Sequence, residues 1–192
     1  MFYDAVPDPY CYPGTSVLKN RLGLRTQVEL DAFEHDMTAQ RFDEALPAGR
    51  LGVTHYKAIH RHMFQDVYPW AGRFRTVRIS KGGSVFCYPE HIVSEMRKVF
   101  VDLGQRHHLR GLSTEDFAVQ SARFLADINA IHPFREGNGR TQLVFFTLLA
   151  IRAGHPLDLE RLDPTVFLGA IIESFRASED ALADVIRFLA TR

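Results

Sequence analysis

The sequence predicts a mainly α-helical domain that carries a single β-hairpin. Apolar residues recur at helical spacing in most segments, and only residues 75–88 alternate with the period of two that a strand requires. Gly82 and Gly83 lie in the middle of that stretch, where a tight hairpin turn needs positive φ angles. A chain of 192 residues can bury a sizeable core, so we expect residues 1–192 to form one domain.

The composition is that of an ordinary globular protein. The 23 Lys and Arg residues balance the 23 Asp and Glu residues, so net charge gives no indication of direct binding to nucleic acid or a membrane. No apolar run reaches the roughly 18 residues that a membrane span requires. Cys11 and Cys87 lack metal-ligand spacing, and the N-terminus has no apolar signal sequence, so we expect free thiols and a cytoplasmic protein.

The first third of the chain predicts an irregular lead-in followed by two helices. Proline and glycine punctuate residues 1–25, where we expect no regular element. Thr26 and Glu29 have the spacing of a capping box, and apolar residues at helical spacing follow them to about residue 42. A second helix is expected at about 53–64.

Residues 75–88 form the predicted hairpin. Val77 and Ile79 alternate with polar residues in the first strand, 75–80, and the second strand covers 84–88. Because an isolated hairpin is marginally stable, we expect it to pack on the helical body or to accept a strand from a partner. A basic stripe on it is either a solvated face or a contact for phosphate or an acidic target: Arg73, Arg75, Arg78 and Lys81.

The remainder of the chain predicts five more helices. Ser113 and Asp116 have capping-box spacing at the start of the helix that ends at Ile131. The segment 143–151 is apolar on nearly every face, which predicts a central, buried helix. The other expected helices cover about 90–107, 164–175 and 179–190.

Chemically active residues are concentrated between the two central helices, at 131–140. Gly137 and Gly139 flank Asn138 and leave bare backbone N–H groups at a helix start, which is an arrangement that binds anions. Arg140 adds a guanidinium fork suited to phosphate oxygens. Glu136 is a carboxylate of the kind that holds Mg²⁺ together with substrate phosphates.

Two further residues complete this stretch. His132 titrates near neutral pH and is the natural proton acceptor, while Phe134 is an apolar anchor for the loop. Each residue also has a plainer interpretation, since a histidine before proline often only ends a helix and a first-turn glutamate is often solvated. The combination favours nucleotide phosphate chemistry, although no Walker loop is present. Other histidines lack a third metal ligand and are expected to be structural: His60, His62, His107 and His108.

Nine consecutive residues, His-Pro-Phe-Arg-Glu-Gly-Asn-Gly-Arg at 132–140, resemble the H-x-F-x-[D/E]-G-N-G-R-x-x-R signature of Fic-domain proteins. The segments 9–13, 68–72 and 75–88 also resemble the toxin branch of that family. The resemblance implies a mainly helical Fic fold with a hairpin flap at 75–88 and an active-site loop and helix start at 132–143. It further implies transfer of AMP from ATP, with Mg²⁺, to a hydroxyl group of a target protein.

The resemblance also implies a role for each matching residue. His132 would be the catalytic base, Glu136 would hold Mg²⁺, and Arg140 would hold the charge of the leaving group. The expected nucleotide-binding residues are Phe134, Gly137, Asn138, Gly139, Arg140 and Leu143. The expected target-binding flap residues are Ile79, Ser80, Lys81, Gly82, Gly83, Ser84, Val85 and Phe86.

Leu143 departs from the signature, which has a second arginine at that position. In the family that arginine contacts the γ-phosphate and pairs with an inhibitory glutamate. Loss of a charge-assisted contact costs about 1.5–3 kcal/mol. The alternative prediction is therefore a nucleotide-binding Fic protein with weak or altered activity, and transfer of a phosphate or another nucleotide-derived group is a third interpretation.

The resemblance extends to partners. The family's inhibitory segment, [S/T]-x-x-x-E-[G/N], does not occur in this sequence. A toxin-branch protein of this kind implies a separate small antitoxin that carries the inhibitory helix, in the cytoplasm of a bacterium. Toxin-branch relatives modify the ATPase subunits of DNA gyrase and topoisomerase IV, which are the expected targets, whereas other relatives modify small GTPases.

Overall fold

The computed structural model of the protein describes residues 8–81 and 84–191. Within these residues the chain forms seven α-helices, two short 3₁₀ turns and two short strands. The helices are α1 (Gln27–Phe42), α2 (Val53–Phe64), α3 (Pro89–Gln105), α4 (Thr114–Ile131), α5 (Asn138–Ala153), α6 (Pro164–Arg176) and α7 (Asp180–Leu189). The turns and strands are η1 (His107–Leu109), η2 (Leu159–Arg161), β1 (Ser80–Lys81) and β2 (Ser84–Val85). The predicted mainly helical fold is confirmed.

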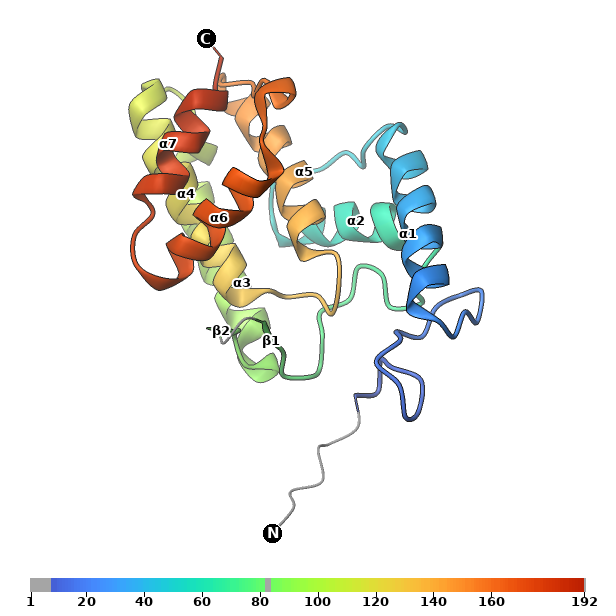
Figure 1. Ribbon diagram of the computed structural model, residues 1–192. Coiled ribbons are helices and arrows are strands. Elements are labelled where there is room, and N and C mark those ends of the chain that lie inside the picture. The colour runs from blue at the N-terminus through green and yellow to red at the C-terminus, as the bar shows by residue number, and fades with distance from the viewer. Residues whose placement is uncertain (1–7, 82–83, 192) are drawn as a thin grey trace.

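Helix α5 lies at the centre of the molecule, between α1 and α2 on one side and α4, α6 and α7 on the other (Figure 1). Its Phe145 and Phe146 are completely buried. The Phe145 ring meets the rings of Tyr56 and Phe100, both at 5.4 Å between centroids. The prediction of a central, buried helix is therefore confirmed.

Both predicted N-caps form, each with a hydrogen bond from the third helical N–H to the capping hydroxyl. Thr26 Oγ1 accepts a hydrogen bond from Glu29 N at 3.4 Å and donates one to the Glu29 carboxylate at 2.5 Å, at the start of α1. Ser113 Oγ accepts from Asp116 N at 3.1 Å at the start of α4. Each cap satisfies a backbone N–H that has no partner inside the helix. These two helix starts therefore follow from local sequence.

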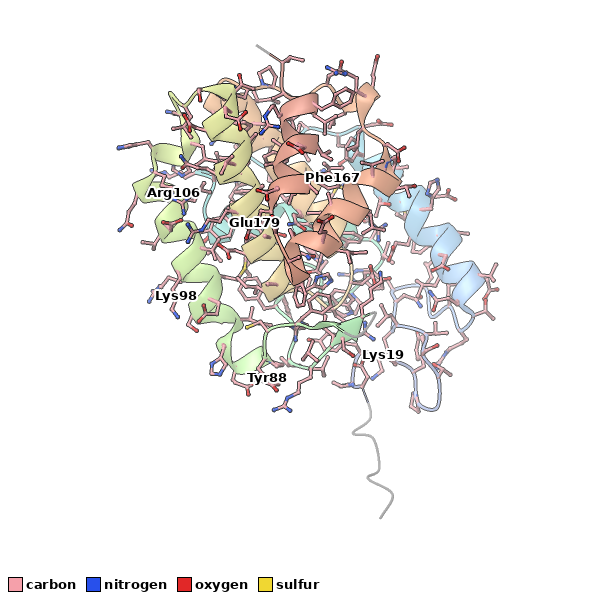
Figure 2. All side chains as sticks on the ribbon, turned by 60° about the vertical axis from the view of Figure 1, so that its left-hand side comes forward. Lys19, Tyr88, Lys98, Arg106, Phe167 and Glu179 are labelled. Carbon is pink, nitrogen blue, oxygen red and sulfur yellow. The ribbon has the colours of Figure 1, made fainter. Side chains whose placement is uncertain are left out.

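The strands of the predicted hairpin are much shorter than expected. β1 and β2 pair antiparallel over two residues each, with Ser80 opposite Val85 and Lys81 opposite Ser84, beside the start of α3 (Figures 1 and 2). Gly82 and Gly83, the predicted turn, lie outside the described residues. Phe86 N still donates to Ile79 O at 3.3 Å, but further out the backbone bonds elsewhere: Arg75 N donates to Pro133 O at 2.9 Å and Cys87 N to Ala130 O at 3.1 Å. The end of α4 thus takes hydrogen bonds that longer strands would have exchanged. We call residues 75–88 the flap segment.

The lead-in is irregular from residue 8 to residue 25, as predicted, apart from one bridge between Cys11 and Leu18. Cys11 and Cys87 are both free thiols. Among the described residues, no helix combines the length and the apolar character needed to cross a membrane.

Candidate active site

Helix α4 places His132 at its end. His132 is the C-cap of α4, with φ 48° and ψ 62°, and its N–H donates to Ile128 O at 3.0 Å. A left-handed conformation costs a residue other than glycine about 1–2 kcal/mol, so the surrounding structure must stabilise it. Pro133 follows and has no N–H with which to continue the helix. The imidazole is thus projected from a fixed helix end.

The surroundings of the His132 ring prepare it as a base. The ring stacks on Phe86 at 4.0 Å between centroids, and Nδ1 lies 3.3 Å from Asn129 O. Burial lowers the pKa of His132 to about 4, so the ring is neutral at physiological pH. A carbonyl oxygen only accepts, so Nδ1 carries the proton and Nε2 keeps a lone pair. Nε2 is therefore the atom that can take a proton.

The loop after His132 is fixed by buried contacts. Phe134 is completely buried and stacks on His60 at 3.7 Å between centroids. Asn138 accepts from Phe134 N at 2.9 Å and donates to Phe134 O at 2.8 Å through its side chain. The Asn138 side chain is thus committed to the loop, and only its backbone N–H remains for a ligand. Phe134 is the apolar anchor that was predicted.

His60 holds the same loop from α2. Its Nδ1 accepts from Gly72 N at 2.8 Å, so Nε2 carries the proton that it donates to Glu136 O at 3.0 Å. Burial lowers the pKa of His60 to about 4. His62 Nε2 bonds the backbone oxygen of Arg41 at 3.0 Å. Both histidines therefore have structural partners, as predicted, and His60 was not recognised as a support of the loop.

The start of α5 has the geometry of an anion site. Gly137 has φ 79°, and a Cβ built there would lie 2.4 Å from the Phe64 ring, so only glycine fits. The first helical bond runs from Thr141 N to Gly137 O at 3.1 Å. The N–H groups of Asn138, Gly139 and Arg140 consequently have no partner inside the helix. Together with the helix dipole they favour a negatively charged ligand.

The Glu136 carboxylate is 46% exposed at the edge of this helix start. Its Oε1 accepts from Gly137 N at 2.8 Å and lies 3.8 Å from the Arg140 guanidinium. No group of three or more His, Cys, Asp or Glu side chains suited to a metal occurs among the described residues. Mg²⁺ commonly takes one or two carboxylates and completes its shell with substrate phosphates and water, so a single exposed carboxylate fits this ion.

Arg140 has partners on its other side. Its guanidinium pairs with Glu34 of α1 and lies 4.7 Å from the centroid of the Phe64 ring. The Tyr68 hydroxyl donates to the same Glu34 carboxylate. Leu143, one turn further along α5, is half-buried and provides no charge. Sequence reasoning did not identify Glu34 or Tyr68 as neighbours of the site.

These elements enclose a cavity of about 650 Å³. One wall carries predicted site residues: His132, Glu136, Asn138, Gly139, Arg140 and Leu143. The flap segment contributes Ile79, Ser80, Lys81 and Phe86, whereas Val85 is 61% exposed and does not line the cavity. Gly82 and Gly83 cannot be placed because they lie outside the described residues.

Helix α6 supplies the opposite, apolar wall, which was not predicted. Its lining residues include Phe167, Leu168 and Ile172 (Phe167 is labelled in Figure 2). Leu168 and Ile172 are 57% and 44% exposed, so this helix shows apolar side chains beyond the face that it buries. The sequence does carry a signal, because 164–175 is apolar on more than one helical face.

The residues of the predicted basic stripe lie in different environments. Arg75 is only 2% exposed, which contradicts both a solvated face and a phosphate contact. Its guanidinium donates to the carbonyl oxygens of His132 (2.8 Å), Ile131 (3.1 Å), Val77 (2.6 Å) and Cys87 (2.6 Å). The charge thus lies at the C-terminal, negative end of the α4 dipole. Arg75 therefore links the backbone of His132 to residues near both ends of the flap segment, Val77 and Cys87.

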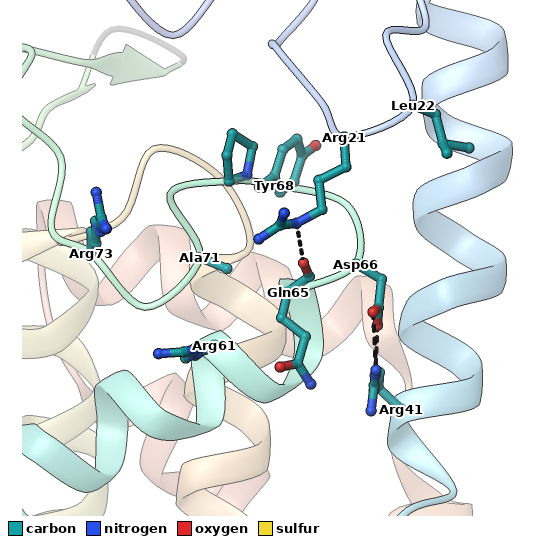
Figure 3. A pocket seen from close by; sticks show the side chains of 10 residues that line it. Arg21, Leu22, Arg41, Arg61, Gln65, Asp66, Tyr68, Ala71 and Arg73 are labelled. Atoms are coloured by element: carbon teal, nitrogen blue, oxygen red, sulfur yellow. Dashed lines mark hydrogen bonds and ion pairs between the residues drawn. The ribbon is translucent and has the colours of Figure 1, made fainter.

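A second cavity, of about 600 Å³, is lined by Arg21, Arg41, Arg61 and Arg73 (Figure 3). The one carboxylate in its lining, Asp66, accepts from Arg41 at 2.6 Å and 3.0 Å. Tyr68 lines this cavity and donates its hydroxyl to Glu34, the partner of Arg140. Because no histidine lines it, we do not assign catalysis to this cavity.

Comparison with known proteins agrees with the geometry. The profile of the Fic/DOC family matches residues 50–150. The probable protein adenylyltransferase y4lH of Sinorhizobium fredii is 55% identical over 96% of this chain and 97% of its own length. Protein adenylyltransferase VbhT of Bartonella schoenbuchensis is 36% identical over 96% of this chain and 39% of its own.

The fold has solved relatives as well. The BepC protein of Bartonella tribocorum, solved with bound AMPPNP, superposes with a TM-score of 0.84 at 24% identity, over 95% of this chain and 96% of that one. At this identity the likeness concerns the fold, which is the mainly helical Fic fold. The chain belongs to the Fic/DOC family and is a nucleotidyltransferase of the protein adenylyltransferase kind.

Proposed function

We propose that the chain transfers AMP from ATP to a hydroxyl side chain of a target protein. The observation that carries this proposal is the shared cavity of about 650 Å³, which the neutral base His132 and the anion-binding start of α5 line together. A base and a phosphate site on one cavity are the two parts that a hydroxyl attack on a phosphate requires. Neither part alone would favour transfer over binding.

The transfer step balances with groups of the chain and its two substrates. His132 Nε2 accepts the proton of the target hydroxyl, and the oxygen forms a bond to the α-phosphorus of ATP. The bond between the α-phosphorus and the bridging oxygen breaks, and pyrophosphate leaves with its electron pair. The N–H groups of Gly139 and Arg140 and the guanidinium of Arg140 stabilise the negative charge on the phosphates.

Glu136 would hold Mg²⁺ together with phosphate oxygens, and the ion would neutralise phosphate charge. The apolar wall of α6, with Phe167, Leu168 and Ile172, suits the flat, uncharged adenine ring, since aromatic and aliphatic side chains can bury its faces. Nucleotide binding by the fold is supported by the BepC relative, which was solved with AMPPNP.

The flap segment would hold the target. Ser80 and Lys81 line the cavity and belong to β1, a short strand with a single partner among the described residues, so its free edge suits pairing with an extended target segment. Main-chain pairing fixes the depth at which a hydroxyl side chain enters the cavity. Ser84 and Val85 of β2 pair with the other edge of β1 and would hold that strand in place for the target.

We infer a toxin role from the resemblance to the toxin branch. The partner would be a small bacterial antitoxin that carries the [S/T]-x-x-x-E-[G/N] helix, and the ATPase subunits of DNA gyrase and topoisomerase IV head the list of targets. Co-expression with a candidate antitoxin should restore growth to cells that express this chain. Growth arrest that persists for His132→Ala would contradict a role of AMP transfer in toxicity.

A second candidate function is nucleotide binding with weak transfer. The observation that favours it is Leu143, which lines the cavity one turn after Arg140 and offers no charge to the phosphates. This candidate predicts nucleotide binding by calorimetry without turnover.

The test of AMP transfer uses purified protein, Mg²⁺ and bacterial lysate with ATP labelled at either the α- or the γ-phosphate. Transfer of AMP predicts α-label on protein, no γ-label, and loss of the signal in His132→Ala. Retention of γ-label would show phosphorylation instead. If no label rises above the His132→Ala background while nucleotide binding is intact, the result would reject AMP transfer and favour the second candidate, nucleotide binding with weak transfer.

A further inference from the structure

Both arginines that line the catalytic cavity are paired with carboxylates from the first 42 residues of the chain. Arg135 meets Asp8 of the lead-in, with Nε and one terminal nitrogen each 2.8 Å from Oδ2. Arg140 pairs with Glu34 of α1. Asp8 and Glu34 both precede residues 50–150, which the family profile matches. Two independent contacts therefore join the N-terminal segment to the site.

Glu34 is the more constrained of the two carboxylates. Its side chain is 13% exposed, and each oxygen has a partner: Arg140 on Oε1 and the Tyr68 hydroxyl on Oε2. Tyr68 is 2% exposed and stacks on Trp70 at 4.4 Å between centroids. A buried, stacked tyrosine cannot follow a moving carboxylate, so Glu34 has one defined position.

The position of Glu34 determines that of Arg140. An arginine side chain has several rotatable bonds, and the Arg140 side chain is 40% exposed, so without a partner it would sample many orientations. The guanidinium has five N–H donors, of which Glu34 engages only part, and the others remain for phosphate oxygens. Leu143 replaces the signature's second arginine, so Arg140 is the one arginine in the first two turns of α5.

We propose that Glu34 and Asp8 are positioning residues that hold Arg140 and Arg135 ready for the phosphates of the nucleotide. The N-terminal segment then belongs to the nucleotide site and does more than cover the helical core. Glu34 acts with Tyr68 as the stronger element, because its carboxylate is 13% exposed against 27% for Asp8 and has the Tyr68 hydroxyl as a second partner. The proposal rests on the nucleotide site assigned above and does not require transfer.

The test measures dissociation constants of ATP and AMP by calorimetry, with Mg²⁺, for the full chain. Arg140 is assigned to the leaving-group phosphates, which AMP lacks. Glu34→Ala should weaken ATP binding about tenfold and leave AMP binding within about twofold. Glu34→Gln keeps an acceptor for Arg140 and should retain most of the ATP affinity. Asp36→Ala, at an exposed position of the same helix, is the matched control and should change neither constant.

A double mutant separates positioning through Arg140 from other effects. In an Arg140→Ala background, Glu34→Ala should make no further difference to ATP binding. Tighter ATP binding by Glu34→Ala would show that Glu34 merely neutralises Arg140, and would overturn the proposal. Equal weakening of ATP and AMP, or additive losses in the double mutant, would overturn it as well.

Two further variants serve if Glu34→Ala does not fold. Tyr68→Phe removes only the hydroxyl that fixes Glu34 and should weaken ATP binding several-fold with AMP unchanged. Asp8→Asn should do the same to a smaller extent, and ATP affinity equal to the wild type in both variants would contradict the proposal. Since these are binding measurements, missing transfer activity alone would reject AMP transfer and leave this inference standing.

Discussion

The buried, neutral state of His60 makes the stability of this protein depend on pH. Burial lowers the pKa of His60 to about 4, whereas an unfolded histidine has a pKa of about 6.5. Between these values the unfolded chain binds a proton at this site and the folded chain does not. Stability is therefore fully present above about pH 6.5 and is lost as the pH falls toward 4.

The magnitude follows from the two pKa values. One bound proton changes the free energy of unfolding by about 1.4 kcal/mol per pH unit, so His60 contributes a loss of about 3 kcal/mol by pH 4. The physical cause is visible in the contacts, because Nδ1 accepts the Gly72 N–H at 2.8 Å and a protonated Nδ1 would oppose another donor. His132, whose pKa is also lowered to about 4, should add a loss of similar size.

Urea unfolding at about pH 7, 6 and 5, followed by the fluorescence of the single Trp70, measures this dependence. The variant His60→Gln keeps a donor for Glu136 O and removes the titrating group. Its free energy of unfolding should be lower at pH 7, but should fall less steeply with acid, by about 1 kcal/mol per pH unit on average between pH 7 and 5. Other titrating groups contribute equally to both proteins. A slope equal to that of the wild type would refute the assignment of a neutral, buried His60.

Three further predictions concern the active-site loop, the flap segment and Leu143 in the second turn of α5. Gly137→Ala places a Cβ 2.4 Å from the Phe64 ring at a φ of 79°, so the free energy of unfolding in denaturant should fall by about 2–4 kcal/mol. Gly139→Ala, with no atom within 4 Å of its Cβ, should have a free energy of unfolding near that of the wild type. Arg75→Met removes the guanidinium that donates to four carbonyl oxygens and should lower the free energy of unfolding by about 3 kcal/mol. An unchanged midpoint of denaturant unfolding would show that these hydrogen bonds do not stabilise the fold. Leu143→Arg should raise AMP transfer about tenfold to a hundredfold if only that charge is missing, and transfer rates equal to the wild type would show that Leu143 does not limit activity.

Local sequence was sufficient for much of the fold and for the centre of the site. The capping residues Thr26 and Ser113 fix helix starts through contacts three residues apart, and such contacts can be recognised in the chain itself. The stretch from His132 to Arg140 is likewise continuous, so its base, loop anchor and helix start could be predicted together. The end of the helix before Pro133 follows the same local logic, since a helix usually stops at or before the residue that precedes a proline.

The remaining features depend on contacts between distant residues. Arg75 belongs to the basic stripe that was predicted to be solvated or to contact phosphate or an acidic target, but the end of α4 provides enough carbonyl oxygens to bury its charge. Glu34 lies 106 residues before Arg140, and no local pattern connects them. The apolar wall of α6 becomes a cavity wall only through its packing on α4 and α7. Tertiary context, and not helix propensity, decides these three cases.

The location of a bound, non-hydrolysable ATP analogue in a crystal of this protein tests the central claim most directly. We expect phosphate oxygens at the N–H groups of Gly139 and Arg140, the adenine ring against α6, and the α-phosphorus facing His132 Nε2. Phosphates bound among Arg21, Arg61 and Arg73 in the second cavity, or an α-phosphorus out of reach of a hydroxyl held by His132, would contradict it.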